Sequence, residues 1–224
     1  MLAGSFRNPL IIMCKYKWMF GLIVMTMVLP SFTDLVPSEE KDFELIFEKN
    51  SVQVLERWNA DAGGKEHREL KAVLNVRANH DALVAAVREK RKGLLWMQRV
   101  AQLESLPGGR SGQWRTYIRY GLPWPARDHD CVLSYQQAQP REGHTVVTFQ
   151  STQMTDYPPQ KGVHRILGLS GRWEFSAQAD SSYKVAYYVQ TADSSPIPRF
   201  ILDPLVRSNL LSTMEAFREV VEGR

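Results

Sequence analysis

Apolar side chains follow a helical pattern most clearly near the end of the chain, across residues 193–221. They recur there at steps of three or four residues, and the charged side chains fall elsewhere on the helical wheel. The apolar positions are Leu202, Val206, Leu210, Met214, Phe217 and Val221. This spacing predicts an amphipathic helix about six turns long, which opens after Pro196 to Pro198. Two arrangements stay open at Pro204: Asp203 caps a helix that begins there, or one continuous helix is kinked there.

Before this helix, at least seven segments alternate between apolar and polar residues, which is typical of half-buried antiparallel strands. The predicted strands cover residues 51–58, 70–76, 97–104, 113–120, 130–137, 144–151, 163–175 and 183–191. The Ser170-Gly171 pair predicts a β-bulge that bends the strand around it. The side chains of segment 113–120 that we expect to point inward are Trp114, Thr116, Ile118 and Tyr120.

Two shorter helices and two rigid loops complete the predicted elements. One helix begins at Ser38 and ends near Asn50, and the other is capped by Asn79 and ends at Lys92-Gly93. Residues 121–126 contain two prolines on either side of Trp124, so they form a loop rather than a strand. Residues 154–162 form the second loop, around Tyr157-Pro158-Pro159.

One large antiparallel sheet and one long helix predict an α+β fold, in which the helix covers one face of a curved sheet. Aromatic residues are concentrated in the second half of the chain. Most of them belong to the core, but a sheet of this size with a single long helix leaves space between the two layers. The pattern therefore favours binding of a hydrophobic molecule over catalysis.

The net charge of +4 gives little reason to expect nucleic acid as a partner. Three of the basic residues, Arg7, Lys15 and Lys17, precede the first acidic residue, Asp34, and the rest of the chain carries only +1. The basic run from Arg88 to Lys92 is most simply a solvated helix end. Contact with anionic lipid headgroups is the alternative interpretation of this run.

The first 33 residues have the layout of a bacterial export signal. Lys15 and Lys17 precede an unbroken apolar run, Trp18 to Leu29, which small residues follow. We expect cleavage near residues 31–33 and an exported, periplasmic domain over residues 34–224, or else an uncleaved membrane anchor. After cleavage Cys131 would be the single thiol, so no internal disulfide is available.

No metal site and no catalytic set is predicted. The five histidines are scattered without ligand spacing, and Ser170 lacks the pattern of a nucleophile elbow. His129 lies between Asp128 and Asp130, and we interpret this as a loop in which the carboxylates accept backbone and imidazole hydrogen bonds. No cofactor is expected.

Four motifs in this order resemble START (StAR-related lipid transfer) domains. They are Pro123-Trp124-Pro125 followed by His129-Asp130, the stretch 159–165 (PQKGVHR), Gly171-Arg172-Trp173, and Ile197-Pro198 before the last helix. The resemblance covers about residues 42–222. It implies a helix-grip fold of the SRPBCC superfamily, with a tunnel for a lipid, and transient contact with a membrane. It also implies that loops 121–126 and 157–161 cover the mouth of the tunnel.

The chain departs from the family at two places. START domains usually carry Arg-Asp where this chain has His129-Asp130. The charged pair that some sterol-binding members use corresponds to Thr116 and Tyr135, which would suit a neutral ligand head better.

We expect a lipid or other hydrophobic small molecule to be bound by side chains of the sheet, the loops and the helix. The predicted binding residues are Trp114, Thr116, Ile118, Tyr120, Trp124, Tyr135, Phe149, Arg165, Tyr187, Phe200, Leu210 and Met214. Two alternatives remain. One is an enzyme similar to polyketide cyclases and aromatases, in which Arg165, His164 or Tyr187 would move protons. The other is a ligand-free interaction module held at a membrane by an uncleaved leader.

Overall fold

The computed structural model describes residues 42–60, 63–121, 127–191 and 199–224, with side chains in the last range from Asp203 onward. The elements, in chain order, are β1 (Glu44–Lys49), β2 (Val52–Ala60), β3 (Glu66–Val76), α1 (His80–Arg88), α2 (Lys90–Trp96), β4 (Val100–Leu106), β5 (Gln113–Tyr120), β6 (His129–Arg141), β7 (His144–Thr152), β8 (His164–Arg165), β9 (Leu169–Ala177), β10 (Tyr183–Thr191) and α3 (Arg199–Glu222). The predicted leader, residues 1–33, and Trp124 lie outside the described residues.

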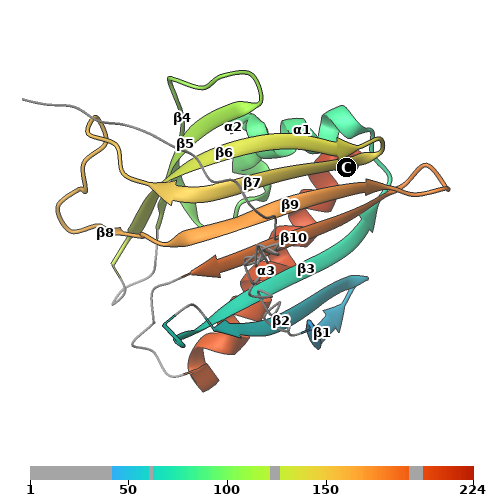
Figure 1. Ribbon diagram of the computed structural model, residues 1–224, viewed down its shortest axis with the longest axis horizontal. Helices are drawn as coiled ribbons and strands as arrows, with labels where there is room; N and C mark the ends of the chain where they lie inside the picture. Colours follow the sequence, from blue (N-terminus) through green and yellow to red (C-terminus); the bar gives the residue numbers. More distant parts are fainter. Residues whose placement is uncertain (1–41, 61–62, 122–126, 192–198) are drawn as a thin grey trace, which may run out of the picture. The chain divides into compact units, whose positions relative to one another are not determined.

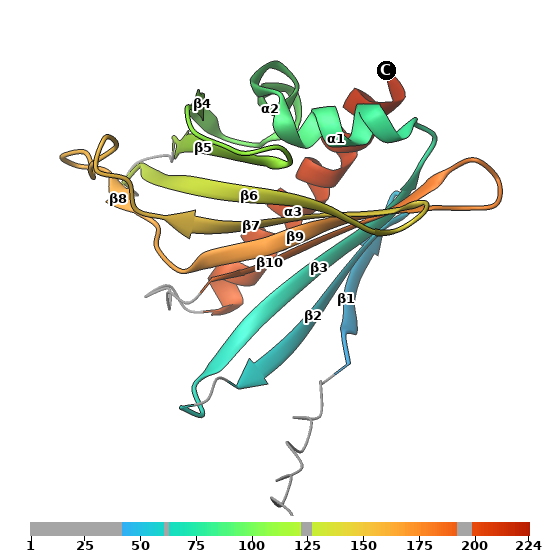
Figure 2. The same cartoon turned by 45° about the horizontal axis from the view of Figure 1, so that its top comes forward.

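Ten strands form one sheet in the order β1-β2-β3-β10-β9-β7-β6-β5-β4, and β8 pairs with β6. Every pair along the main path is antiparallel, and only β8 runs parallel to its neighbour. The sheet curves around α3, which crosses behind it in Figure 1, with α1 and α2 beside the end of α3 (Figures 1 and 2). The predicted α+β helix-grip architecture is therefore confirmed.

The long C-terminal helix buries the predicted face. Leu210, Met214, Phe217 and Val221 are all buried, at the four-, three- and four-residue steps seen in the sequence. The helix runs from Arg199 through Pro204 without interruption, so the continuous arrangement is the observed one.

The predicted first helix is wrong, because residues 44–49 form strand β1. Phe43, Ile46 and Phe47 have helical spacing, but the β1–β2 register shifts between Leu45 and Phe47. Such an irregularity breaks the period of two and places the neighbours Ile46 and Phe47 both in half-buried positions. The result imitates a helical pattern.

The second predicted helix is two helices. Asn79 caps α1 as expected, since its side-chain oxygen accepts the Ala82 N–H at 2.8 Å. Glu89 then has an extended backbone (φ −88°, ψ 125°), which ends α1 and starts α2.

The predicted bulge at Ser170-Gly171 is also wrong, because β9 pairs with β7 and β10 in unbroken register. A Cβ at Gly171 would lie 2.5 Å from Cζ of Phe149 and 2.1 Å from the carbonyl oxygen of Tyr188. Glycine is therefore required here by close packing. Its missing side chain lets the rings of Phe149 and Tyr187 stack across β9 with centroids 5.9 Å apart.

Candidate functional site

The concave face of the sheet, which faces α3, has a solid half and a half lined by polar-tipped aromatic residues. The solid half lies under the end of α3, where Trp173 stacks on Phe217 at 4.7 Å and contacts Trp96 edge-on at 5.3 Å. Trp96 also donates its indole N–H to the Ala86 carbonyl at 2.8 Å. Trp173, Phe175 and Phe217 are almost fully buried, so this end of the layer is close-packed core.

The same core cluster continues from Trp173, whose ring lies 4.3 Å from that of Tyr187, into a row of aromatic rings on the concave face. Trp114 of β5 stacks on Tyr135 of β6 at 5.1 Å, and Tyr135 contacts Phe149 of β7 at 5.8 Å. Tyr187 of β10 completes the row next to Phe149. Four strands therefore present an apolar wall with hydroxyl and indole tips.

The polar tips of this wall lack hydrogen-bond partners. The indole nitrogen of Trp114 is sealed from solvent and bonds to nothing. Within the described part of the chain, the phenol oxygens of Tyr120, Tyr135 and Tyr187 also form no hydrogen bond, but unlike the Trp114 nitrogen they are not sealed from solvent, and Tyr120 and Tyr187 are half-buried. A buried donor without a partner, such as the Trp114 nitrogen, is uncommon in folded proteins, and it marks a place where a ligand or water can complete the bonding.

These phenols stay neutral at any physiological pH. Burial, with a smaller contribution from the neighbouring Cys131 and tyrosines, raises the pKa of Tyr120 and Tyr135 well above the ordinary value near 10. Burial also raises the pKa of Tyr187. The wall therefore offers neutral hydrogen-bonding groups and no phenolate.

One charged cluster lies on the same concave face, and the sequence analysis missed it. Arg68 of β3 donates to Glu56 of β2 and to Asp203 of α3, each at 2.7 Å from its Nε or Nη1. All three side chains are only 15–16% exposed. The signal was present in the sequence, because Glu56 and Arg68 occupy the inward positions of strands whose other inward residues are apolar. The cluster ties the first half of α3 to the sheet.

Of the predicted binding residues, nine lie on the concave side. Trp114, Thr116, Ile118 and Tyr120 share one face of β5, and their register partners place Tyr135, Phe149 and Tyr187 on the same side. Leu210 and Met214 belong to the buried face of α3. Trp124 and the side chain of Phe200 lie outside the described residues.

Arg165 does not join this group. It lies on the outer, convex face of the sheet, where Nε and Nη2 donate to the Asp130 carboxylate at 2.7 and 3.1 Å. Tyr117, whose ring also points outward, donates to Asp130 at 3.1 Å. Burial and this hydrogen bond raise the Tyr117 pKa to about 12. The group fastens the connection between β7 and β9 over the sheet, since Arg165 also donates to the Tyr157 carbonyl.

The residues around His129 differ from the prediction as well. Asp128 and Asp130 accept from Arg119 and Arg165 rather than from imidazole. The His129 ring lies 5.0 Å from that of His164, and burial with the His164 charge lowers the His129 pKa. The three residues proposed for acid–base chemistry, Arg165, His164 and Tyr187, are therefore split between the two faces of the sheet.

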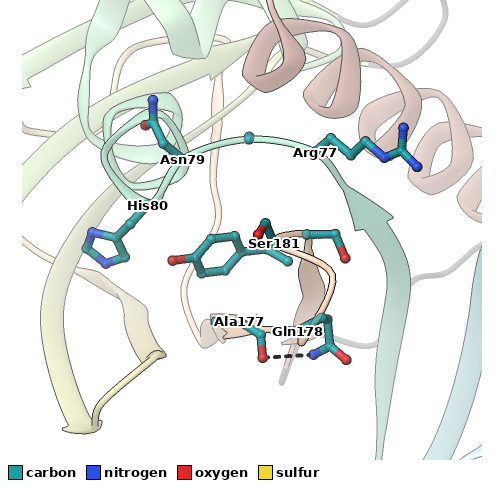
Figure 3. A pocket seen from close by; sticks show the side chains of 9 residues that line it. Arg77, Asn79, His80, Ala177, Gln178 and Ser181 are labelled. Atoms are coloured by element: carbon teal, nitrogen blue, oxygen red, sulfur yellow. Dashed lines mark hydrogen bonds between the residues drawn. The ribbon is translucent and has the colours of Figure 1, made fainter.

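Two surface hollows lie away from the aromatic wall. One, of about 550 Å³, is formed by the start of α1 and the β9–β10 turn, with His80, Gln178 and Ser181 around it (Figure 3). The other, of about 400 Å³, lies at the far end of β2 and β3 beside Ser170 and Gln190. Both are open to solvent and mixed in polarity, and neither has the character of a lipid site. In the described residues, no group of three or more His, Cys, Asp or Glu side chains could hold a metal ion. The search of described helices for a membrane span finds no candidate.

Cys131 is buried on the concave side of β6, where it pairs with Ile118 of β5. We expect its thiol to resist modification in the folded protein. Burial raises its pKa to about 12, with the Asp130 charge as a smaller cause. Since thiolate is the reactive form, a Cys14→Ser chain should react with iodoacetamide at pH 8 only after unfolding. The raised pKa also means that folding stability falls as the pH rises from about 9 toward 12.

A thiol on the exposed side of the same strand supplies the control. Gln136→Cys in a Cys14→Ser, Cys131→Ser chain should react at the rate of a free cysteine. Equal rates for Cys131 and this control would show that the wall is open to solvent.

The solved structures that this fold matches include several START domains. A STAR-related lipid transfer protein from Xanthomonas axonopodis has a TM-score of 0.68 at 24% identity, over 81% of this chain and 99% of that chain. Human STARD10 has a TM-score of 0.67 at 13% identity, over 81% of this chain and 74% of that chain. An aromatase/cyclase from a Streptomyces species has a TM-score of 0.52 at 12% identity, over 70% and 94% of the two chains.

Comparisons with protein-family models and with curated protein sequences find no match. The structural likeness agrees with the motifs around Trp173 and His164-Arg165 that indicated it. The chain has the helix-grip fold of the START lipid-transfer domains, which an aromatase/cyclase shares.

Proposed function

We propose that this protein binds a lipid or other hydrophobic small molecule between the concave face of the sheet and α3, and carries it between membranes. The observation that carries the proposal is the wall of Trp114, Tyr120, Tyr135 and Tyr187. It combines apolar rings with one buried, unpaired indole nitrogen and three phenol oxygens that form no hydrogen bond in the described chain. The START lipid-transfer neighbours support the same function.

The wall suits a ligand with a large apolar body and a small neutral head. Each methylene buried there would contribute roughly 0.8 kcal/mol, before the cost of ordering the chain. Neutral phenols and an indole can bond a hydroxyl, carbonyl or ester group without a charge on either side. Of the charged residues nearby, Glu56, Arg68 and Asp203 are engaged in ion pairs with one another, and Arg88 lies 5.7 Å from the centroid of the Trp114 ring.

We also propose that the protein acts outside the cytoplasm, because its first 33 residues read as an export signal. N-terminal sequencing of the protein from a secreting host tests this. An N-terminus near residues 31–33 supports export with cleavage, and an intact leader supports a membrane-anchored form.

Filling the proposed binding space between the aromatic wall and α3 should remove the ligand. Thr116 is buried on the concave face, and Thr116→Phe should reduce the lipid that copurifies, seen by native mass spectrometry, by at least about tenfold. The added ring should destabilise the fold by about 1–3 kcal/mol, which overpacking usually costs.

The matched control places the same ring on the other face. Thr148 is exposed on the convex side of β7, and Thr148→Phe should keep its lipid. A wild-type chain that stays empty against a broad lipid panel, or equal lipid in both variants, would refute the proposal.

The aromatase/cyclase neighbour keeps an enzyme as the second candidate. It is the weaker one, because Arg165 is engaged by Asp130 on the convex face, on the opposite side of the sheet from Tyr187. Conversion of a polyketide surrogate that Tyr187→Phe abolishes would reverse this order.

A further inference from the structure

The short helix α2 exposes an amphipathic face. Gly93 and Trp96 are buried against the core, which turns the opposite side of the helix outward. That side carries Lys90 and Arg91, followed one turn later by Leu94 and Leu95, which are 45% and 67% exposed. Single exposed leucines are ordinary on protein surfaces, but two neighbours below two cations form a continuous patch.

The charges of this patch have no acidic counterpart in the described chain. Lys92 alone lies near a carboxylate, 3.9 Å from Glu89. Lys90 and Arg91 are exposed and form no ion pair with any described residue. The patch is therefore complementary to a surface that is both anionic and apolar beneath, as a bilayer of anionic lipid is.

A second pair of exposed cations lies at the end of the sheet where β5 stops. The turn between α2 and β4 contains Arg99, exposed and with a left-handed backbone (φ 59°). Its carbonyl accepts the N–H of Gly121 at 2.9 Å, directly after Tyr120. Arg127 is exposed and lies just before β6. It precedes by two residues His129, which pairs with Tyr120 at the end of β5. Two further cations thus border the end of the aromatic wall.

We propose that Lys90, Arg91, Leu94 and Leu95 of α2, with Arg99 and Arg127, dock the protein on an anionic lipid bilayer. The leucines enter the acyl region, while the cations contact lipid phosphates. Docking in this orientation brings the Tyr120 end of the hollow to the membrane. The inference rests on the proposed function for its purpose, but the contact itself is tested separately.

Each cation near an anionic surface strengthens binding about fivefold. Lys90→Ala/Arg91→Ala should therefore weaken partition onto vesicles of about three parts phosphatidylcholine to one part phosphatidylglycerol by roughly 25-fold. Leu94→Ser/Leu95→Ser should weaken it by at least about tenfold. Added salt should weaken the wild type and have less effect on the first variant.

The control removes the same charge elsewhere. Arg141→Ala/Lys184→Ala removes two exposed cations. Arg141 is the last residue of β6, at the end away from His129, and Lys184 lies near the start of β10. This variant should leave partition within about twofold of wild type. All chains are compared in the form that the expressing cell leaves, with the N-terminus sequenced and the melting temperature measured. A shared leader then contributes equally to every variant.

Three results would overturn the docking proposal. They are partition unchanged in both α2 variants, an equal loss in the control, or a wild-type dimer that Leu94→Ser/Leu95→Ser converts to monomer. The last result would assign the face to a second copy of this chain. Lipid extraction separates the two proposals. A wild-type protein that contains no lipid but still binds vesicles through α2 refutes the carrier function. A wild-type protein that contains lipid, with vesicle partition unchanged in both α2 variants, refutes docking alone.

Discussion

Asp130→Ala is expected to lower the free energy of unfolding by roughly 3–5 kcal/mol, because it leaves the buried Arg165 guanidinium without its counter-charge. Asp130 is completely buried and the Arg165 side chain is only 7% exposed. The carboxylate accepts two hydrogen bonds from Arg165 and one from Tyr117, so three hydrogen bonds are lost together. Urea unfolding followed by tryptophan fluorescence measures the loss.

The exposed neighbouring pair is the control. Arg119 and Asp128 lie 2.7 Å apart but are 33% and 28% exposed. Arg119→Ala should cost below about 1 kcal/mol, as surface pairs do. Asp130→Leu combined with Arg165→Met should recover much of the lost stability, because it removes both charges. A cost for Asp130→Ala as small as that of Arg119→Ala would show that the convex group is not a structural anchor.

Trp173→Ala is expected to cost roughly 3–5 kcal/mol of stability, because Trp173 is 2% exposed and no nearby side chain can fill the space. It contacts Trp96, Tyr187 and Phe217, which come from α2, β10 and α3. The deletion should also extend the proposed binding space toward the packed core around Trp96 and Phe217. Native mass spectrometry of the variant should then show bound lipids shifted to longer chains.

Trp114→Ala provides the comparison that tests whether a hollow exists. Trp114 is half-buried, its ring stacks on Tyr135 with the Arg88 guanidinium 5.7 Å from its centroid, and its indole N–H is unpaired. Its removal should cost only about 1–2 kcal/mol and reduce the amount of bound lipid. If it costs as much as Trp173→Ala, that region is solid core and a carrier function is untenable.

The errors in the sequence interpretation have specific physical causes. The register irregularity in β1 put Ile46 and Phe47 together and imitated a helix. Gly171 was taken for a bulge, whereas it is required by the close approach of Phe149 and of the Tyr188 backbone from two neighbouring strands. Both effects depend on partner strands, and no local pattern contains them.

Arg165 was assigned to the ligand because residues 159–165 belong to a motif of the resemblance, not because its spacing specified a face. The strand it occupies, β8, has only two residues, too few for alternation to indicate which side is buried. Only the pairing of β8 with the start of β6 puts Arg165 beside Asp130. The same pairing separates it from Tyr187.

The amino-acid sequence alone predicts most of the long strands, the buried face of α3 and the inward face of β5, because periods of two and 3.6 residues are properties of the local backbone. It does not predict that segment 163–175 divides into β8 (His164–Arg165) and β9 (Leu169–Ala177). Which residues those faces contact depends on the tertiary structure. The registers of β3 with β10 and of β9 with β7 join residues far apart in the chain. They bring Arg68 to Asp203, pack Phe149 and the Tyr188 backbone closely against Gly171, and leave the tips of Tyr135 and Tyr187 without a hydrogen bond in the described chain. Burial and pairing depend on the whole set of neighbours, and that set exists only after the sheet has closed around the helix.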